Sequence, residues 1–337
     1  MQSSISRIQT TQMAALVHTA VRALEPVGDR QQSTPSAFFD ALKRLYLSSF
    51  ERRNALLDGL FYDVSTITKS EAAELSPALA EEGAIVYVPT TASSEPLKVI
   101  KTLTELATQT PKPKALAIAG VGSSALGSAA LARNVADALD APAVAVVSGY
   151  GAADLMTEAL GGYFLFGTLN RIRHAFDTIE AMTSQWSSLF NASSGQKSLG
   201  FGLRKFSDVA ATAALLRDEN FEFSVLCGHS KGNLILAEAL EKIVSLPDKK
   251  HMKRIAARSQ VITLSAAIQM PSEFAPIIDV LGTADPLGRA NSRPFISIEK
   301  KLPGVGHHTN TEFPDIVPKP LNVTEVIRNI LKEKQAR

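Results

Sequence analysis

The sequence predicts a protein of the α/β class, with a mostly parallel sheet covered by helices on both faces. Short apolar runs alternate with helical patterns from about residue 83 to the end of the chain. These runs have almost no polar positions, so each strand must be buried on both sides, which is typical of a parallel sheet. With 337 residues, 45% of them hydrophobic and 20% charged, the chain can bury a large core.

Helices and strands are expected in a regular order. Residues 1–82 are predicted to be an N-terminal helical extension, because the apolar residues of Phe38–Phe61 recur at helical spacing, and residues 83–337 are predicted to be the main domain. The predicted strands are Gly83–Pro89, Lys114–Gly120, Pro142–Gly151, Phe223–Gly228, Ser259–Ile268, Ala275–Gly282 and Pro294–Leu302. The predicted helices are Leu97–Gln109, Ala125–Leu139, Ser207–Asn220, Asn233–Leu246 and Leu321–Gln335.

The overall charge argues against a nucleic-acid partner. A formal net charge of +2 is small, and no DNA- or RNA-binding signature accompanies it. The basic run Lys249–Arg254 is typical of a solvated helix end, with peripheral contact to an anionic membrane or ligand as the alternative.

The single cysteine and the start of the sequence bear on the cellular compartment in which the protein is expected. Cys227 excludes an intramolecular disulfide and a cysteine-rich metal site, and its apolar neighbours predict a buried core residue. No secretory pattern opens the sequence, so we expect a cytoplasmic protein. A transit peptide is the alternative, because the first acidic residue is Glu25.

The motif Gly-His-Ser-Lys-Gly at residues 228–232 is the strongest chemical signal. A nucleophilic serine in a parallel sheet must project from the carboxyl end of a strand, in a sharp turn that two flanking glycines permit. Ser230 lies between Gly228 and Gly232, after an apolar run and before a helical pattern. The amides that begin such a helix face the reaction centre, so the Lys231 amide is a predicted oxyanion donor. The alternative is a tight turn with an inert serine.

On this motif and its context, the sequence resembles the α/β-hydrolase superfamily over roughly residues 84–335. The resemblance implies the α/β-hydrolase fold and the chain order nucleophile, acid, histidine. The expected acid is Asp285, three residues past Gly282 at the end of a predicted strand. Asp279, inside that strand, is its rival, and a role in capping the turn is the alternative for Asp285.

The base is sought among six histidines. His307 directly follows Gly306 in the loop before the last predicted helix, where the superfamily carries its histidine, so it is the expected base. His308 is the alternative. The other four histidines are not expected to act as the base. His18 and His174 precede the nucleophile, His229 is its neighbour and is expected to point away from it, and His251 lies in the basic run.

A second oxyanion donor is implied in the loop after an earlier strand. The resemblance assigns it to the amide of Val121, with Gly122 and Ser123 as near alternatives. Ala119 stands where the superfamily often has histidine, a departure that removes no backbone donor.

The same loop supports a competing interpretation. Residues 120–125, "GVGSSA", fit the G-x-G-x-x-A pattern of dinucleotide-binding folds, which would make the protein an NAD(P)-dependent oxidoreductase. However, the next strand leads into "VVSGYG", which offers no acidic ribose ligand. A non-catalytic member of the hydrolase fold that binds a lipid or partner protein is a third hypothesis.

A helical, cap-like insertion is expected at about residues 155–205. It is rich in large apolar residues, and Phe164 and Phe166 are predicted to line an acyl pocket, with an extra structural layer as the alternative. The sequence thus predicts a serine hydrolase that cleaves carboxylic esters of lipid or other apolar acyl type. We expect neither a cofactor nor a metal, and an acyl thioesterase is the nearest alternative activity.

Overall fold

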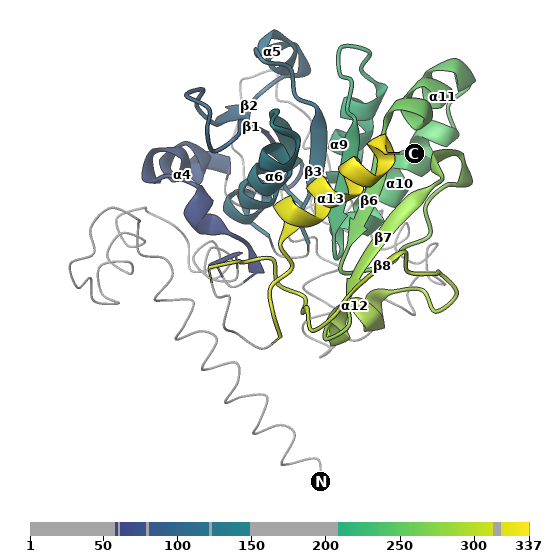
Figure 1. The fold of residues 1–337 in the computed structure, drawn as a ribbon. Helices are drawn as coiled ribbons and strands as arrows, with labels where there is room; N and C mark the ends of the chain where they lie inside the picture. Colours follow the sequence, from purple (N-terminus) through teal and green to yellow (C-terminus); the bar gives the residue numbers. More distant parts are fainter. Residues whose placement is uncertain are drawn as a thin grey trace, which may run out of the picture.

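The computed structural model describes residues 58–59, 61–78, 81–120, 123–148, 208–312 and 318–336. The predicted insertion, with Phe164 and Phe166, lies outside the described residues, as does most of Phe38–Phe61. Figure 1 shows a central sheet with helices packed on both of its faces. Within the described ranges, no helix combines the length and the apolar character needed to cross a membrane.

The sheet has eight strands in the order β2-β1-β4-β3-β5-β6-β7-β8. Strand β1 runs antiparallel to its neighbours β2 and β4, and every other pair is parallel. The predicted α/β class with a mostly parallel sheet is therefore confirmed. The strands are β1 (Ile85–Val88), β2 (Lys98–Ile100), β3 (Ala115–Ile118), β4 (Ala143–Val146), β5 (Val225–His229), β6 (Gln260–Leu264), β7 (Ile277–Gly282) and β8 (Lys300–Leu302).

Helices cover the sheet in two layers (Figure 1). One layer contains α6 and α13, and the other contains α9 and α10, each pair in close contact. The described α-helices are α4 (Lys69–Leu75), α5 (Leu103–Thr108), α6 (Ala125–Leu139), α9 (Asp208–Arg217), α10 (Gly232–Val244), α11 (Lys249–Arg258), α12 (Pro286–Asn291) and α13 (Val323–Gln335). The short 3-10 helices are η1 (Val64–Thr66), η2 (Ser76–Ala78) and η4 (Ser272–Phe274).

Strand β3 illustrates why the apolar runs form this sheet. Ala115 and Ala117 pack into the core beneath α6 and α13, whereas Leu116 and Ile118 pack into the core beneath α9 and α10. All four side chains are fully buried, as the pleat of a strand with no polar face requires. Cys227 on β5 is also fully buried, which confirms its predicted place in the core.

Two predicted elements differ from the structure. The segment Leu97–Gln109, predicted as one helix, is strand β2 followed by helix α5, because its β-branched start pairs with β1 and Thr102 caps the helix. The predicted strand Pro294–Leu302 is reduced to β8 at its end. Phe295 in its first part is 95% exposed, so this apolar residue has no core to join.

The described end of the predicted N-terminal extension packs into the main core. Tyr62, Val64 and Leu75 are buried in the core that also holds α6 and α13. Polar contacts reinforce this packing, since Arg133 of α6 is paired with Glu71 of α4. Residues 58–78 are therefore part of the same packed unit as the sheet.

Candidate active site

The turn around Ser230 joins the carboxyl end of β5 to the start of α10. Ser230 has a φ of +54°, in the left-handed region that costs a non-glycine residue about 1 kcal/mol or more. Its backbone N–H donates to the carbonyl oxygen of Leu264 at the end of β6, at 2.9 Å. The side chain is half-buried. The predicted strand, sharp turn and helix are thus present at the predicted positions.

The two glycines of the motif allow close backbone approach. A Cβ atom at Gly228 would lie 2.9 Å from the backbone nitrogen of Asn233, and one at Gly232 would overlap the carbonyl oxygen of Ile118 on β3. Neither neighbour can move easily, because Ile118 is part of the central sheet and Asn233 is inside α10. The glycines let the helix begin directly against the strands.

We expect Gly232→Ala to lower the free energy of unfolding by roughly 3 kcal/mol, because the added methyl group must displace the β3 backbone. Gly304→Ala is the matched control. Gly304 has a φ of +71°, and a Cβ atom added there would meet no other atom within 4 Å, so that change should cost only the backbone strain of about 1 kcal/mol. Urea unfolding of both variants measures the difference, and equal losses would contradict the close-approach explanation.

The three predicted catalytic residues lie together in a hydrogen-bonded line. Nε2 of His307 is 3.1 Å from Oγ of Ser230. Nδ1 of His307 is 3.0 Å and 2.9 Å from the two carboxylate oxygens of Asp285. In the sequence, Asp285 is 22 positions and Ser230 is 77 positions from His307, so only the fold brings the three residues together. This geometry lets an imidazole accept a proton from the serine while a carboxylate orients its other nitrogen.

Asp285 is held for this role by its surroundings. Its carboxylate is fully buried, which by itself would raise its pKa, but the hydrogen bond and charge of His307 hold the pKa below the usual value. The same carboxylate caps α12 by accepting the Gly288 amide at 2.6 Å. The predicted catalytic contact and the alternative capping role are therefore both present in one side chain.

The rival acid, Asp279, lies elsewhere. Its carboxylate accepts a hydrogen bond from the Thr263 hydroxyl on β6, and its backbone amide donates to Glu299 at 3.0 Å. Burial is the main cause that raises the pKa of Asp279 to about 6, and Glu299 adds to it. Asp279 of β7 thus forms a carboxyl pair with Glu299, which lies just before β8.

The contacts with Ser230 and Asp285 are made by His307 and not by His308. The Nε2 atom of His308 is buried and has no hydrogen-bond partner among the residues that the structure describes, and burial lowers the pKa of His308. His251 on α11 is bonded to the Leu216 carbonyl oxygen at 2.9 Å. His18 and His174 lie outside the described residues.

The predicted oxyanion loop is described only in part. Val121 and Gly122 lie outside the described residues, whereas the Ser123 amide donates to the Gly120 carbonyl oxygen at 3.3 Å. The amides of Gly120 and Ser124 are also engaged, by the Tyr62 hydroxyl at 2.7 Å and by Asp58 at 3.1 Å. Ser123 is therefore disfavoured as the second donor, and Val121 and Gly122 stay as predictions. Lys231 stands at the start of α10, as predicted.

The start of helix α6 holds a carboxylate of the chain itself. Asp58 is 1% exposed and accepts the amides of Ser124 and Gly127, each at 3.1 Å. A Cβ atom at Gly127 would overlap this carboxylate. The dinucleotide hypothesis assigns a pyrophosphate to the same helix start, so the position of Asp58 argues against it.

Two residues at the site were missed by sequence reasoning. His229, expected only to point away from the nucleophile, is 1% exposed and contacts His307 with a ring-centroid separation of 5.1 Å. Its Nδ1 lies 3.0 Å from the hydroxyl of Tyr62. The two residues are 167 positions apart, and no local pattern signals such a pairing.

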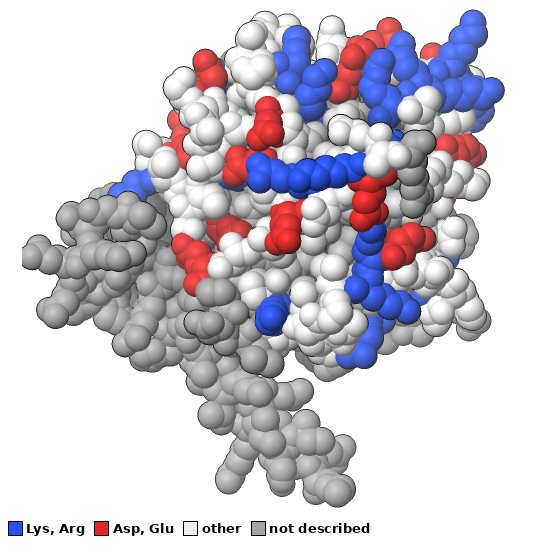
Figure 2. Space-filling model, in the orientation of Figure 1, with Lys and Arg blue, Asp and Glu red and all other residues white. Residues whose placement is uncertain are grey.

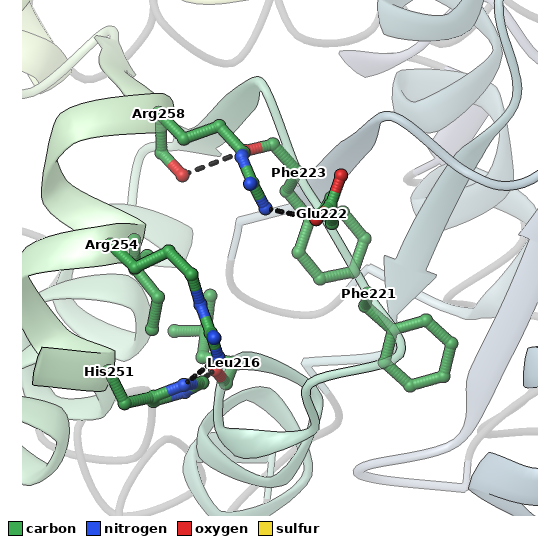
Figure 3. A pocket seen from close by; sticks show the side chains of 9 residues that line it. Leu216, Phe221, Glu222, Phe223, His251, Arg254 and Arg258 are labelled. Carbon is green, nitrogen blue, oxygen red and sulfur yellow. Dashed lines mark hydrogen bonds and ion pairs between the residues drawn. The ribbon is translucent and has the colours of Figure 1, made fainter. Parts of the chain in front are cut away.

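A separate surface pocket lies at the amino ends of β5 and β6 (Figure 3). Its lining includes Phe223, just before β5, and Arg254 and Arg258 of α11. Both arginines are already paired with glutamates, at 2.8 Å for Arg254 and 2.7 Å for Arg258. Figure 2 shows Lys and Arg side chains gathered over α11. This helix contains the predicted basic run, whose Lys and Arg side chains are exposed and whose His251 and Met252 are buried. This basic surface is remote from Ser230, because the two lie at opposite ends of β5.

The sequence and the structure were compared with those of known proteins. The chain matches no protein-family model, no curated protein and no solved structure. The hydrogen-bonded residues Ser230, His307 and Asp285 and the turn at Ser230 are therefore the features that bear on function.

Proposed function

We propose that this protein is a serine hydrolase that cleaves carboxylic esters through an acyl-enzyme. The observation that carries the proposal is the line from Ser230 Oγ to His307 Nε2, at 3.1 Å, and from His307 Nδ1 to Asp285, at 2.9 Å. Support also comes from the left-handed φ of Ser230, which fits the sharp strand-to-helix turn that presents a nucleophilic serine. The resemblance of residues 228–232 to the α/β-hydrolase nucleophile turn points to the same chemistry.

The proposed mechanism follows from these contacts. Nε2 of His307 accepts the proton of Ser230 as Oγ attacks the acyl carbon, and the negative charge develops on the former carbonyl oxygen. The Asp285 carboxylate orients the imidazole and stabilises the imidazolium. His307 then protonates the leaving alcohol, and a water molecule activated by the same imidazole hydrolyses the acyl-enzyme. The amides of Lys231 and Val121 are the proposed oxyanion donors.

The proposed substrate is an ester with a lipid-like or other apolar acyl group. This part depends on the aromatic residues predicted for the insertion, including Phe164 and Phe166. Hydrolysis of nitrophenyl esters from acetate to long acyl chains tests the proposal. We expect measurable turnover that rises with chain length. A preference for acyl thioesters of the same chain length would instead favour the thioesterase alternative, and absence of turnover on either class would favour a binding protein.

Asp285→Asn is expected to lower kcat by roughly 10⁴-fold, because an amide cannot fix the required imidazole tautomer. Asp279→Asn is the matched control and should leave kcat within threefold. Loss of activity in both variants, or only in Asp279→Asn, would contradict the assignment of the acid.

The stability of the control variant Asp279→Asn, relative to the wild type, is also expected to depend on pH. Because burial raises the pKa of Asp279 from 3.8 to about 6, the folded state disfavours its ionised form, so stability is lost as pH rises through this window. Relative to the wild type, Asp279→Asn should gain roughly 2 kcal/mol between about pH 4 and about pH 7. Urea unfolding across this pH range measures the gain, and a constant difference would contradict the prediction.

A further inference from the structure

Tyr62 connects three separate parts of the candidate active site. Its hydroxyl oxygen lies 2.7 Å from the Gly120 amide nitrogen and 3.0 Å from Nδ1 of His229. Nε2 of His229 lies 3.0 Å from the carbonyl oxygen of His307. We name this chain of contacts, from Gly120 through Tyr62 and His229 to His307, the Tyr62 bridge.

The direction of each hydrogen bond in the Tyr62 bridge is fixed by chemistry. The His307 carbonyl oxygen only accepts, so Nε2 of His229 must carry the proton and Nδ1 must accept. The Tyr62 hydroxyl then donates to Nδ1 and accepts from the Gly120 N–H. Every donor therefore has an acceptor, provided that His229 is neutral. Burial, with a contribution from His307, lowers the pKa of His229 to about 3, which favours the neutral form.

The Tyr62 bridge is buried, so its hydrogen bonds are costly to break. Tyr62 is 4% exposed and His229 is 1% exposed. In such surroundings a polar group that loses its partner keeps its full desolvation penalty. The bridge therefore resists movement of the backbone at His307 and at Gly120, which directly precedes the predicted oxyanion residue Val121.

We propose that Tyr62 is a positioning residue for the catalytic site, which acts through His229 on the His307 backbone and through the Gly120 amide on the predicted oxyanion loop. This inference rests on the proposed hydrolase function for its effect on rate, but its structural part can be measured without a substrate.

The residues around Tyr62 hold the same two loops. The carbonyl oxygen of Phe61 accepts from the amide and the hydroxyl of Thr309, at 2.7 Å and 2.9 Å. The Phe61 ring meets the His307 ring edge-on at 6.1 Å between centroids. The side-chain amide of Asn310 donates to the Gly59 carbonyl oxygen at 2.8 Å. The loop that carries the proposed base is thus hydrogen-bonded to residues 248 and 251 positions earlier.

Asp58 holds the residues that follow the predicted oxyanion loop in the sequence. It binds the amides of Ser124 and Gly127 at the start of α6, whereas Tyr62 binds the amide of Gly120. Two side chains of one short segment thereby bind backbone amides that come before and after Val121 and Gly122 in the sequence. A single segment that fastens the base loop and the oxyanion loop is what a positioning role requires.

Tyr62→Phe removes only the hydroxyl that links Gly120 to His229. We expect kcat for ester hydrolysis, per active site titrated, to fall roughly 10- to 100-fold with KM within about twofold, because misplacement of the base affects the chemical step. Tyr87→Phe is the matched control. Tyr87 is also buried and donates one hydrogen bond, to the Pro111 carbonyl oxygen at 2.8 Å, in the other core. This control should lose comparable stability and no kcat.

Two changes at His229 separate positioning from packing. His229→Gln keeps an N–H group able to reach the His307 carbonyl oxygen, whereas His229→Leu has a similar size and no donor. The Gln variant should retain at least tenfold more kcat than the Leu variant at equal titrated site concentration. Equal kcat in the two variants, or unchanged kcat in Tyr62→Phe, would overturn the positioning role.

Nitrogen NMR of the imidazole rings tests the inference independently of turnover. In the wild type, His229 should be neutral with its proton on Nε2. In Tyr62→Phe the proton should stay on Nε2, because the His307 carbonyl oxygen still accepts it, but the Nδ1 signal should shift to that of a nitrogen that has lost its hydrogen-bond donor, together with shifted His307 signals. Unchanged His229 and His307 signals would overturn the inference. If these signals move but the wild-type protein hydrolyses no ester, the Tyr62 bridge stands and the proposed hydrolase function fails.

Discussion

Ser230→Ala is expected to lower ester hydrolysis by on the order of a million-fold while leaving the fold intact. The reason is that Oγ of Ser230 is the atom bonded to His307 Nε2, and no other hydroxyl shares that bond among the described residues. Alanine occupies the same space without the hydroxyl, so the turn keeps its contacts. The expected melting temperature is therefore within a few degrees of the wild type.

A matched serine makes this result specific. Ser265 follows β6, the strand beside β5, and also has a left-handed φ, of +56°. Its hydroxyl is buried and has no partner among the described residues. Ser265→Ala should therefore keep kcat within threefold, although it changes a serine in the same backbone conformation. Activity of Ser230→Ala within tenfold of the wild type would refute the assignment of the nucleophile.

His307→Ala should be about as damaging as Ser230→Ala, since the imidazole both accepts the serine proton and delivers it to the leaving group. His308→Ala should keep at least a tenth of the wild-type kcat, because its ring is not bonded to Ser230 or Asp285. Steady-state kinetics on one nitrophenyl ester measures both variants.

The double change Ser230→Ala with His307→Ala tests whether the two residues act together. Groups of one catalytic unit are strongly non-additive, so the double variant should be no slower than either single variant within about threefold. Multiplied losses would mean that the two side chains contribute separately. If His308→Ala proved the inactive variant, His308 would be the base and the bonding of His307 would need another explanation.

The sequence predicted the sheet and the turn at Ser230 for local reasons, whereas the order of acid and histidine after the serine was implied by the resemblance. Strands such as β3 and β5 have no polar face, and the turn at Ser230 needs glycines at fixed positions, so both leave a readable pattern. Segment Leu97–Gln109 was predicted wrongly because the pairing of β2 with β1 decides its first residues. Such pairing depends on a partner strand, which overrides local helical spacing.

The Tyr62 bridge was beyond sequence reasoning for a different reason. Tyr62, His229 and Asp58 are ordinary residues in their local context, and the contacts that matter join positions 58 to 167 apart. Only the fold brings the segment before η1 against the turn at Ser230. A histidine beside a nucleophilic serine gives no sign of its own that it will bond to a tyrosine and to the backbone of another histidine.

Labelling by a fluorophosphonate tests the central claim most directly, because this reagent reacts with a serine only when a base and oxyanion donors activate it. The account predicts one adduct on Ser230 of the folded protein, located by peptide mass spectrometry. It also predicts that labelling falls to background in His307→Ala and in protein unfolded in urea. A folded wild-type protein that forms no adduct, or one labelled at another residue while Ser230 stays unmodified, would contradict the account.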